Sequence, residues 1–163
     1  MFLTILVGIT AWWSSYYGNH QLASVTIRFV HLAGLILGGG TALVADRQIL
    51  RVIRAGSEER EAVLVHVHRA HVQVVWCLFV VAAAGILMTA ADTATFLVSK
   101  LYWIKMVLVG LLIANGVVML VVERRTRQVG VSVGWPRLVA VSTISAILWL
   151  TILFLGTLLT VAA

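Results

Sequence analysis

Long apolar runs are the feature that most constrains the fold of this chain. They extend over Ser24–Asp46, Val63–Ala91, Phe96–Val122 and Leu138–Ala162. Each run exceeds the roughly 20 residues that a helix needs to cross the hydrocarbon core of a bilayer. Hydrophobic residues make up 61% of the chain and charged residues only 11%, so a soluble domain of this length could not hide its apolar surface. Because strand-like alternation is missing, we predict an all-α integral membrane four-helix bundle rather than a β-barrel.

The segment before these runs, residues 1–19, has a different character. It is apolar at first and then aromatic, and it lacks the basic start and the small-residue cleavage site of a secretory signal. We therefore expect it to remain attached to the single four-helix transmembrane domain that we assign to residues 20–163. Its aromatic cluster is typical of headgroup depth and favours a helix lying in the interface, with a short fifth span as the alternative. The cluster consists of Trp12, Trp13, Tyr16 and Tyr17.

Arginine predicts the orientation of the spans. The connections at 47–60 and 124–137 are rich in arginine, whereas the connection at 92–95 has none. The positive-inside rule therefore places the two arginine-rich loops in the cytoplasm and the protein in the inner cell membrane as a multi-pass protein. Short connections also predict that consecutive spans are antiparallel neighbours. This arginine bias accounts for most of the net charge of +6, which also attracts the protein to anionic lipid. No nucleic-acid-binding motif accompanies the charge.

The depth of the polar residues can be estimated from the helical rise. His31, Lys105 and Met106 are expected at a similar height in the outer leaflet, and His71 is expected in the inner leaflet. The heights of His31 and His71 differ by an estimated 13 Å or so at 1.5 Å per residue. These two histidines are therefore not expected to ligate opposite faces of one haem, and two sites are implied if both are ligands.

His31 provides the clearest cofactor signal. Together with Gly34 and Gly38 it forms one stripe on its helix, where small residues let a flat ligand or another backbone approach closely. An axial imidazole beside such a slot is typical of haem in a helical bundle, and Met106 is at the right depth for a second ligand. The alternative is a histidine that bonds across helices beside a tight packing seam. Lys105 either snorkels to the interface or donates to a propionate, a quinone oxygen or an anionic substrate.

The entry to the second span, "VHVHRAH", holds His66, His68 and His71. His68 and His71 share one side of a helix and His66 lies on another. We consider His71 as a candidate ligand of a separate haem. We consider Asp46, His66 and His68 as a small transition-metal site at the inner boundary. The alternatives are interfacial histidines that contact headgroups, and an aspartate paired with an arginine or with His66. Only Asp46 and Glu123 bring carboxylates near the membrane, both at its expected edge, which argues against a proton-driven transporter.

The stretches "RFVHLAGLILGGGTALVADRQIL" and "GILMTAADTATFLVSKLYWIKMVLVGLLIANGVVMLVVERR" resemble a group of small four-helix bacterial membrane proteins without assigned activity. The resemblance covers about Arg28 to Arg125. The "HLAG…GGG" portion is also distantly similar to copper-resistance membrane proteins and to four-helix cytochromes b, which place histidines within helices for copper or haem. The residues that carry the resemblance are His31, Gly38, Gly39, Asp46, Lys105, Met106 and Asn115.

These patterns lead to several functional hypotheses. The first is a b-type haem protein that transfers electrons between a quinone or a redox protein and another acceptor, and so a membrane oxidoreductase if it is an enzyme. A chlorophyll-type pigment on the same histidines is a variant of this hypothesis. The second is a cofactor-free accessory or scaffold subunit that packs into a homo-oligomer or a larger membrane complex. A carrier of a metal ion or of a small molecule is the third.

Overall fold

The computed structural model describes residues 2–162, and the side chains of residues 8–159. These residues form helices and no strand, which confirms the predicted all-α class. In chain order the helices are α1 (Phe2–Asn19), α2 (Gln21–Arg51), α3 (Ser57–Ala91), α4 (Thr93–Val98), α5 (Lys100–Val129) and α6 (Val131–Ala162).

The helices α2, α3, α5 and α6 are each long and apolar enough to cross a membrane, so the chain is an integral membrane protein. They extend beyond the apolar runs of the sequence: α3 begins at Ser57 and α6 at Val131, and Pro136 lies inside α6. A single residue, Gly130, separates α5 from α6. Its φ of 95° lies in the left-handed region, which glycine adopts without the steric penalty that a Cβ brings. The reversal between the last two spans therefore depends on this glycine.

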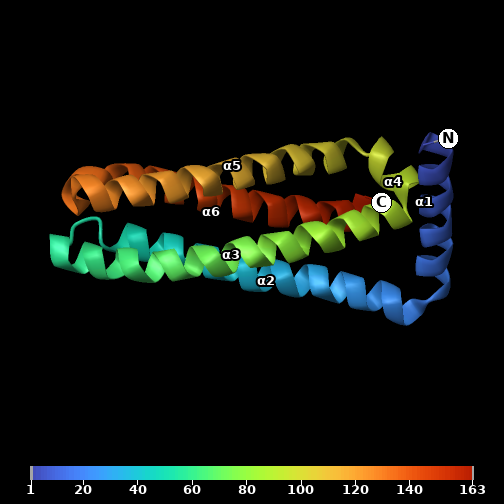
Figure 1. The fold of residues 1–163 in the computed structure, drawn as a ribbon, viewed down its shortest axis with the longest axis horizontal. Coiled ribbons are helices and arrows are strands. Elements are labelled where there is room, and N and C mark those ends of the chain that lie inside the picture. The colour runs from blue at the N-terminus through green and yellow to red at the C-terminus, as the bar shows by residue number, and fades with distance from the viewer. Residues whose placement is uncertain (1, 163) are drawn as a thin grey trace.

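The long helices form two antiparallel hairpins (Figure 1). Helix α2 packs along α3, α5 packs along α6, and the hairpins meet mainly where α2 contacts α6. The prediction that consecutive spans are neighbours is therefore correct for these two pairs, but in the described chain α3 and α5 lack a comparable backbone contact. The connection between them is not a simple turn. It forms α4, whose first turn is capped by the Asp92 carboxylate accepting from the Thr95 amide at 3.2 Å. This extra helix separates the end of α3 from the start of α5.

Helix α1 runs across the end of the four long helices (Figure 1). The indole nitrogen of Trp13 donates to the carbonyl oxygen of Leu87 on α3 at 2.8 Å, which ties α1 to the bundle. Tyr16 stacks on the rings of Trp12, Trp13 and His20. If the long helices cross a bilayer, a helix that runs across their ends lies along its surface, as in the favoured interfacial interpretation of residues 1–19.

The apolar core has two parts. One lies toward the two arginine-rich connections and is centred on the fully buried side chains of Ile49, Val67, Trp135 and Leu138. The other lies nearer the middle of the bundle and contains Ala42, Val74, Leu112, Trp149 and Ile152. Each part collects residues from several long helices, so the core holds the two hairpins together. The outward faces of the same helices carry large exposed apolar side chains, as expected for helices surrounded by lipid.

Candidate functional site

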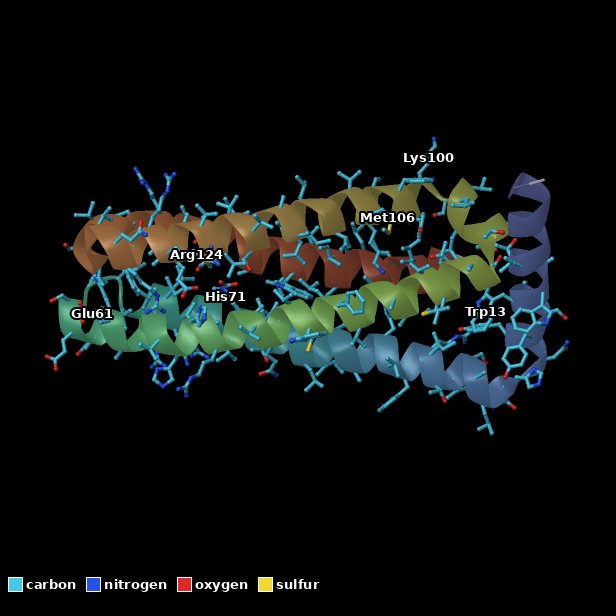
Figure 2. All side chains as sticks on the ribbon, viewed as in Figure 1. Trp13, Glu61, His71, Lys100, Met106 and Arg124 are labelled. Atoms are coloured by element: carbon cyan, nitrogen blue, oxygen red, sulfur yellow. The ribbon has the colours of Figure 1, made fainter. Side chains whose placement is uncertain are left out.

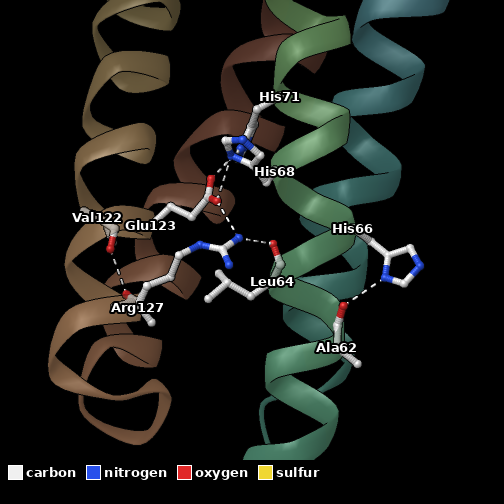
Figure 3. Close-up of polar contacts among 9 residues, drawn as sticks. Ala62, Leu64, His66, His68, His71, Val122, Glu123 and Arg127 are labelled. Atoms are coloured by element: carbon white, nitrogen blue, oxygen red, sulfur yellow. Dashed lines mark hydrogen bonds and ion pairs between the residues drawn. The ribbon is translucent and has the colours of Figure 1, made fainter.

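A polar cluster lies inside the bundle near the arginine-rich end (Figure 3). Its centre is Glu123 on α5, which is 2% exposed. One carboxylate oxygen lies 3.1 Å from Nδ1 of His68 and 3.0 Å from a guanidinium nitrogen of Arg127. The other oxygen lies 3.2 Å from Nδ1 of His71. Because both oxygens are engaged, this buried carboxylate links α3 to α5 across the seam where the two backbones do not pack.

Helical spacing explains how these groups meet. His68 and His71 are three residues apart and project from one side of α3, while Glu123 and Arg127 are four apart and project from one side of α5. Arg127 also donates to the carbonyl oxygen of Leu64 on α3 at 2.9 Å. The guanidinium therefore neutralises the carboxylate and forms a second link between the helices.

The cluster continues toward α2 and α6 through Asp46, which is 2% exposed. The carboxyl group of Asp46 lies within electrostatic reach of the His71 ring and of the hydroxyls of Ser142 and Ser145 on α6. Among the described residues, Oδ2 of Asp46 and Oγ of Ser142 are buried without a hydrogen-bond partner. His71 thus lies between two buried carboxylates, one on α5 and one on α2. Two acids expected at the membrane edge are in fact enclosed by the bundle.

The transition-metal site expected from Asp46, His66 and His68 does not assemble. His66 projects to another side of α3, where its Nδ1 lies 2.8 Å from the carbonyl oxygen of Ala62 (Figure 3). His68 follows His66 by two positions, so the two side chains point in directions that differ by about 200° around the helix axis. Within the described part of the chain, no group of three or more His, Cys, Asp or Glu side chains converges on a metal position.

A cavity of about 270 Å³ lies in the other half of the bundle, between α2, α3, α5 and α6. Its walls are mainly apolar and include Trp149, Leu112 and Ile152 from the middle core. The polar side chains that face it are those of His31, Thr89, Tyr102 and Lys105. Met106 lines the same cavity and is 41% exposed. The structure therefore brings His31, Lys105 and Met106 to one cavity, as their estimated depths suggested.

His31 is held in a fixed orientation at the cavity wall. Its Nδ1 lies 3.0 Å from the carbonyl oxygen of Val81, so Nδ1 carries the proton in this bond and Nε2 keeps its lone pair. Gly85 provides the space for the ring, because a Cβ added there would lie 3.3 Å from Cε1 of His31. The opposite ring nitrogen has no hydrogen-bond partner among the described residues. The imidazole is thus oriented by the backbone and retains one free nitrogen for a ligand.

Lys105 faces the cavity from α5. The ion pairs of residues 8–159 all involve Glu123, so the ammonium group of Lys105 has no carboxylate partner there. It lies near Gly156, where an added Cβ would be 3.7 Å from Nζ, and within electrostatic reach of His31. A cation without an anionic partner in an apolar surrounding is costly, which marks this position as a candidate ligand contact.

The glycine stripe of α2 faces α3 instead of this cavity. A Cβ added at Gly34 would lie 2.6 Å from a methyl carbon of Val81, and one added at Gly38 would lie 2.7 Å from Cβ of Cys77. Of the two occupants considered for the stripe, a flat ligand or another backbone, the structure shows the backbone of α3. Asn115, which carried part of the family resemblance, donates across helices to the carbonyl oxygen of Val141 at 3.3 Å.

Sequence reasoning missed the central role of Glu123. The signal for it was the i, i+4 spacing of Glu123 and Arg127 facing the i, i+3 spacing of His68 and His71, but the contact between α3 and α5 depends on the tertiary fold. Tyr102 and Gly85 were missed because the faces that α3 and α5 turn toward the cavity depend on the tertiary fold. Figure 2 shows His71 and Met106 pointing between the helices at well separated heights.

Comparison with known proteins adds no assignment. No protein-family model, curated protein or solved structure matches the chain. The functional argument therefore depends on the geometry of two places: the polar cluster around Glu123 and the cavity around His31.

Proposed function

We propose that this integral membrane protein binds haem b in the cavity between α2, α3, α5 and α6 and transfers electrons through it. The observation that carries the proposal is the orientation of His31, whose Nδ1 is bonded to the carbonyl oxygen of Val81 and whose Nε2 is free. A backbone carbonyl that fixes the tautomer and angle of an imidazole is a recurrent second partner of metal-ligating histidines. In this proposal His31 is an axial ligand.

The other residues of the cavity are chemically suited to the same group. Met106 supplies a thioether on α5, which is a known second axial ligand that raises the reduction potential of a haem. Lys105 supplies a positive charge for a propionate and has no competing carboxylate among residues 8–159. The mainly apolar walls would suit the apolar macrocycle. When bound, haem supplies one-electron chemistry that no side chain of this chain offers.

A quinone head group is the second candidate, and the size of the cavity favours it. At about 270 Å³ the cavity is near the lower end of the range for small-molecule sites, roughly 300–1,000 Å³. A tetrapyrrole is larger than this volume, whereas a single quinone ring is closer to it in size. The Lys105 ammonium and the Tyr102 hydroxyl are donors suited to quinone oxygens.

His71 is less suited than His31 to hold haem. It does not line this cavity. It also does not line a second, shallow groove, which is formed by residues of α2 and α3 such as Ile36, Gln48 and Arg69. Its Nδ1 is engaged by Glu123. The alternative of a cofactor-free scaffold drew its support from the glycine stripe, which is occupied within the chain by α3. The proposal therefore assigns the cofactor to His31 alone.

The arrangement of the ends supports the proposed orientation in the membrane. Most of the arginines lie in or near the helix ends that meet at the α2–α3 and α5–α6 turns, at one end of the bundle, and α1 and α4 lie at the other end (Figure 1). With the arginine-rich end in the cytoplasm of a cell with an inner membrane, the cavity lies in the outer half of the bilayer.

An absorption spectrum of the purified protein tests this function. The protein is expressed with haem supply, and its oxidised and reduced spectra are recorded in detergent. We expect a Soret band and sharp reduced α-bands in the wild type, their loss in His31→Ala, and their retention in the matched control His66→Ala, because His66 bonds only the carbonyl oxygen of Ala62.

The same preparation distinguishes the quinone alternative. A colourless protein that co-purifies with an extractable quinone, and loses it in Lys105→Leu, supports the second candidate and contradicts the haem. A colourless protein without extractable quinone contradicts both. Retention of the Soret band in His31→Ala would contradict the assignment of the axial ligand.

A further inference from the structure

The shallow groove on α2 and α3 has a volume of about 520 Å³ and lies apart from the Glu123 cluster. Its long polar side chains are those of Gln48 on α2 and of His66, Arg69 and Gln73 on α3. The three residues of α3 repeat at intervals of three and four, so they form one stripe along that helix. Figure 3 shows the ring of His66 pointing away from Glu123, on the other side of α3.

The packing of α2 on α3 determines which groove residues lie at the same height. A Cβ added at Gly38 would lie 2.7 Å from Cβ of Cys77, so these two positions are level across the antiparallel seam. Ten residues further along α2 and ten residues back along α3, Gln48 is therefore level with the interval from His66 to Arg69. The long polar side chains thus gather at the end of the groove that lies toward the arginine-rich α2–α3 connection.

The other end of the groove is apolar. From Gly40 to Ile36 it is lined on α2 by Ile36, Leu37 and Gly40. Leu37 lies about 16 Å from Gln48 along the helix axis, at 1.5 Å per residue. A Cβ added at Gly40 would meet nothing within 4 Å, so this glycine leaves the groove open to the outside. The groove therefore joins a polar end to an apolar stretch that runs parallel to the membrane-spanning helices.

Arg69 gives the polar end an unbalanced positive charge. The ion pairs of residues 8–159 all involve Glu123, so the exposed guanidinium of Arg69 has no carboxylate partner among these residues. The described residues that line the groove include no acid. The nearest acid on this side of α3 is Glu59, seven residues before His66 and thus about 10 Å away along the axis. An anion in the groove would meet Arg69 without a competing carboxylate.

We propose that this groove binds an anionic glycerophospholipid from the membrane leaflet at the arginine-rich end. The lipid phosphate contacts Arg69, and one acyl chain lies along the apolar stretch. A guanidinium offers two parallel N–H donors to a phosphate, and the side-chain amide of Gln48 is a further donor at this level. Basic pockets between membrane helices are typical sites for anionic lipid head groups. His66 stays bonded to the carbonyl oxygen of Ala62 and is not needed for this contact.

A second copy of the chain is the other occupant to consider, and the charge of the groove argues against it. Two copies related by a twofold axis along the membrane normal would present the same patch to each other at the same depth. The two Arg69 guanidinium groups would then meet, with no acid of the groove between them. Like charges at a membrane interface are costly, whereas a phospholipid brings the missing anion itself.

Native mass spectrometry of the detergent-purified protein tests the site, because it resolves each bound lipid by mass. The protein is titrated with dioleoyl phosphatidylglycerol, which is anionic, and with dioleoyl phosphatidylcholine, which has the same chains and no net charge. We expect the wild type to bind the first phosphatidylglycerol more tightly than the first phosphatidylcholine. In Arg69→Gln we expect the affinity for phosphatidylglycerol to fall about fivefold, the factor that corresponds to the free energy of one arginine near an anionic membrane. The affinity for phosphatidylcholine should change little.

Arg124→Gln is the matched control, because Arg124 is exposed on α5 at the same end of the bundle and does not line the groove. It should keep the wild-type preference for phosphatidylglycerol. Gly40→Phe tests the apolar stretch independently of charge. Its ring has room to occupy the groove and should weaken the binding of both lipids by the same factor.

Three results would overturn the proposal. The first is an equal loss of preference in Arg69→Gln and Arg124→Gln, which would indicate a general effect of surface charge. The second is unchanged binding of phosphatidylglycerol in Arg69→Gln or in Gly40→Phe. The third is a lipid-free dimer that dissociates in Gly40→Phe, which would assign the groove to a second copy. The outcome does not depend on haem, because the groove and the His31 cavity share no lining residue.

Discussion

At the arginine-rich end, the buried carboxylate of Glu123 receives contacts from two histidines and an arginine, and the surrounding core is filled by side chains such as Trp135 and Leu138. In the other half, the Lys105 ammonium faces a cavity of about 270 Å³ and, within residues 8–159, meets no carboxylate. The first region pairs its central carboxylate with a guanidinium and two imidazoles, whereas the second leaves a charge and an imidazole nitrogen exposed to a cavity. In a membrane interior, where water is absent, an unpaired charge is costly, and this difference underlies the proposal that the second region binds a ligand.

The largest change in unfolding free energy should come from removing Glu123 from its ion-paired cluster. Glu123→Ala leaves the guanidinium of Arg127 inside the bundle without its anion and removes the acceptor of two histidines. Because the Arg127 side chain is 41% exposed and can be partly solvated, we expect a loss of about 1.5–3 kcal/mol of unfolding free energy, the range for hydrogen bonds to charged groups, instead of the larger cost for a fully buried pair. Unfolding in mixed detergent, followed by circular dichroism, measures this value. Glu61→Ala, at an exposed position of α3, is the control and should change little. Equal stability of the two variants would show that the cluster contributes nothing.

A change in unfolding free energy of the opposite sign is expected for a substitution in the cavity. Lys105→Leu removes an unpaired cation from apolar surroundings and should stabilise the ligand-free protein by up to about 2.5 kcal/mol, the lower figure for a lysine at the centre of a membrane helix. The same unfolding assay measures it. Lys100→Leu is the control, because Lys100 is exposed at the start of α5. Destabilisation by Lys105→Leu in the ligand-free protein would contradict the contrast between the two halves.

The seam between α2 and α3 connects both regions and should respond to added volume. Gly38→Ala places a methyl group 2.7 Å from Cβ of Cys77, whereas Gly40→Ala, two residues later, meets nothing within 4 Å. Overpacking of this kind costs about 1–3 kcal/mol, and a single methyl group belongs at the low end. Gly40→Ala should be neutral or slightly stabilising. Similar unfolding midpoints for the two variants would contradict the packing of α2 on α3.

The smallest effect concerns the attachment of α1. Trp13→Phe removes the hydrogen bond to the carbonyl oxygen of Leu87 and should cost about 0.5–1.5 kcal/mol. Trp12→Phe is the control, because Trp12 is 65% exposed and stacks without such a bond. Hydrogen exchange of the α1 amides measures the loosening. Equal exchange in both variants would show that Trp13 does not secure α1 beside the cavity.

The class and the spans of this fold follow from the sequence, because the length of an apolar run is a local property. The depth of a polar residue in the membrane can be predicted from the sequence almost as well. His31, Lys105 and Met106 face one cavity because antiparallel helices of known rise place residues of equal depth side by side. Which face a helix presents is harder to predict, since it depends on neighbours. The stripe that contains Gly34 and Gly38 was equally compatible with a ligand or with a helix, and only the placement of α3 decides between them.

The role of Glu123 could not be predicted from the sequence either. Its position near the end of an apolar run suggests the membrane edge, but α5 and α6 continue past the run and enclose it. The separation of α3 from α5 arises from α4, which looks like a plain loop in the sequence.

The central claim is that the cavity half of the bundle binds a haem through His31, and the reduced-minus-oxidised absorption spectrum tests it most directly. For protein purified after haem supply, we predict sharp α-bands in the wild type and in His66→Ala, and none in His31→Ala. Bands of equal strength in the wild type and in His31→Ala, or no bands in any of the three proteins, would contradict the claim.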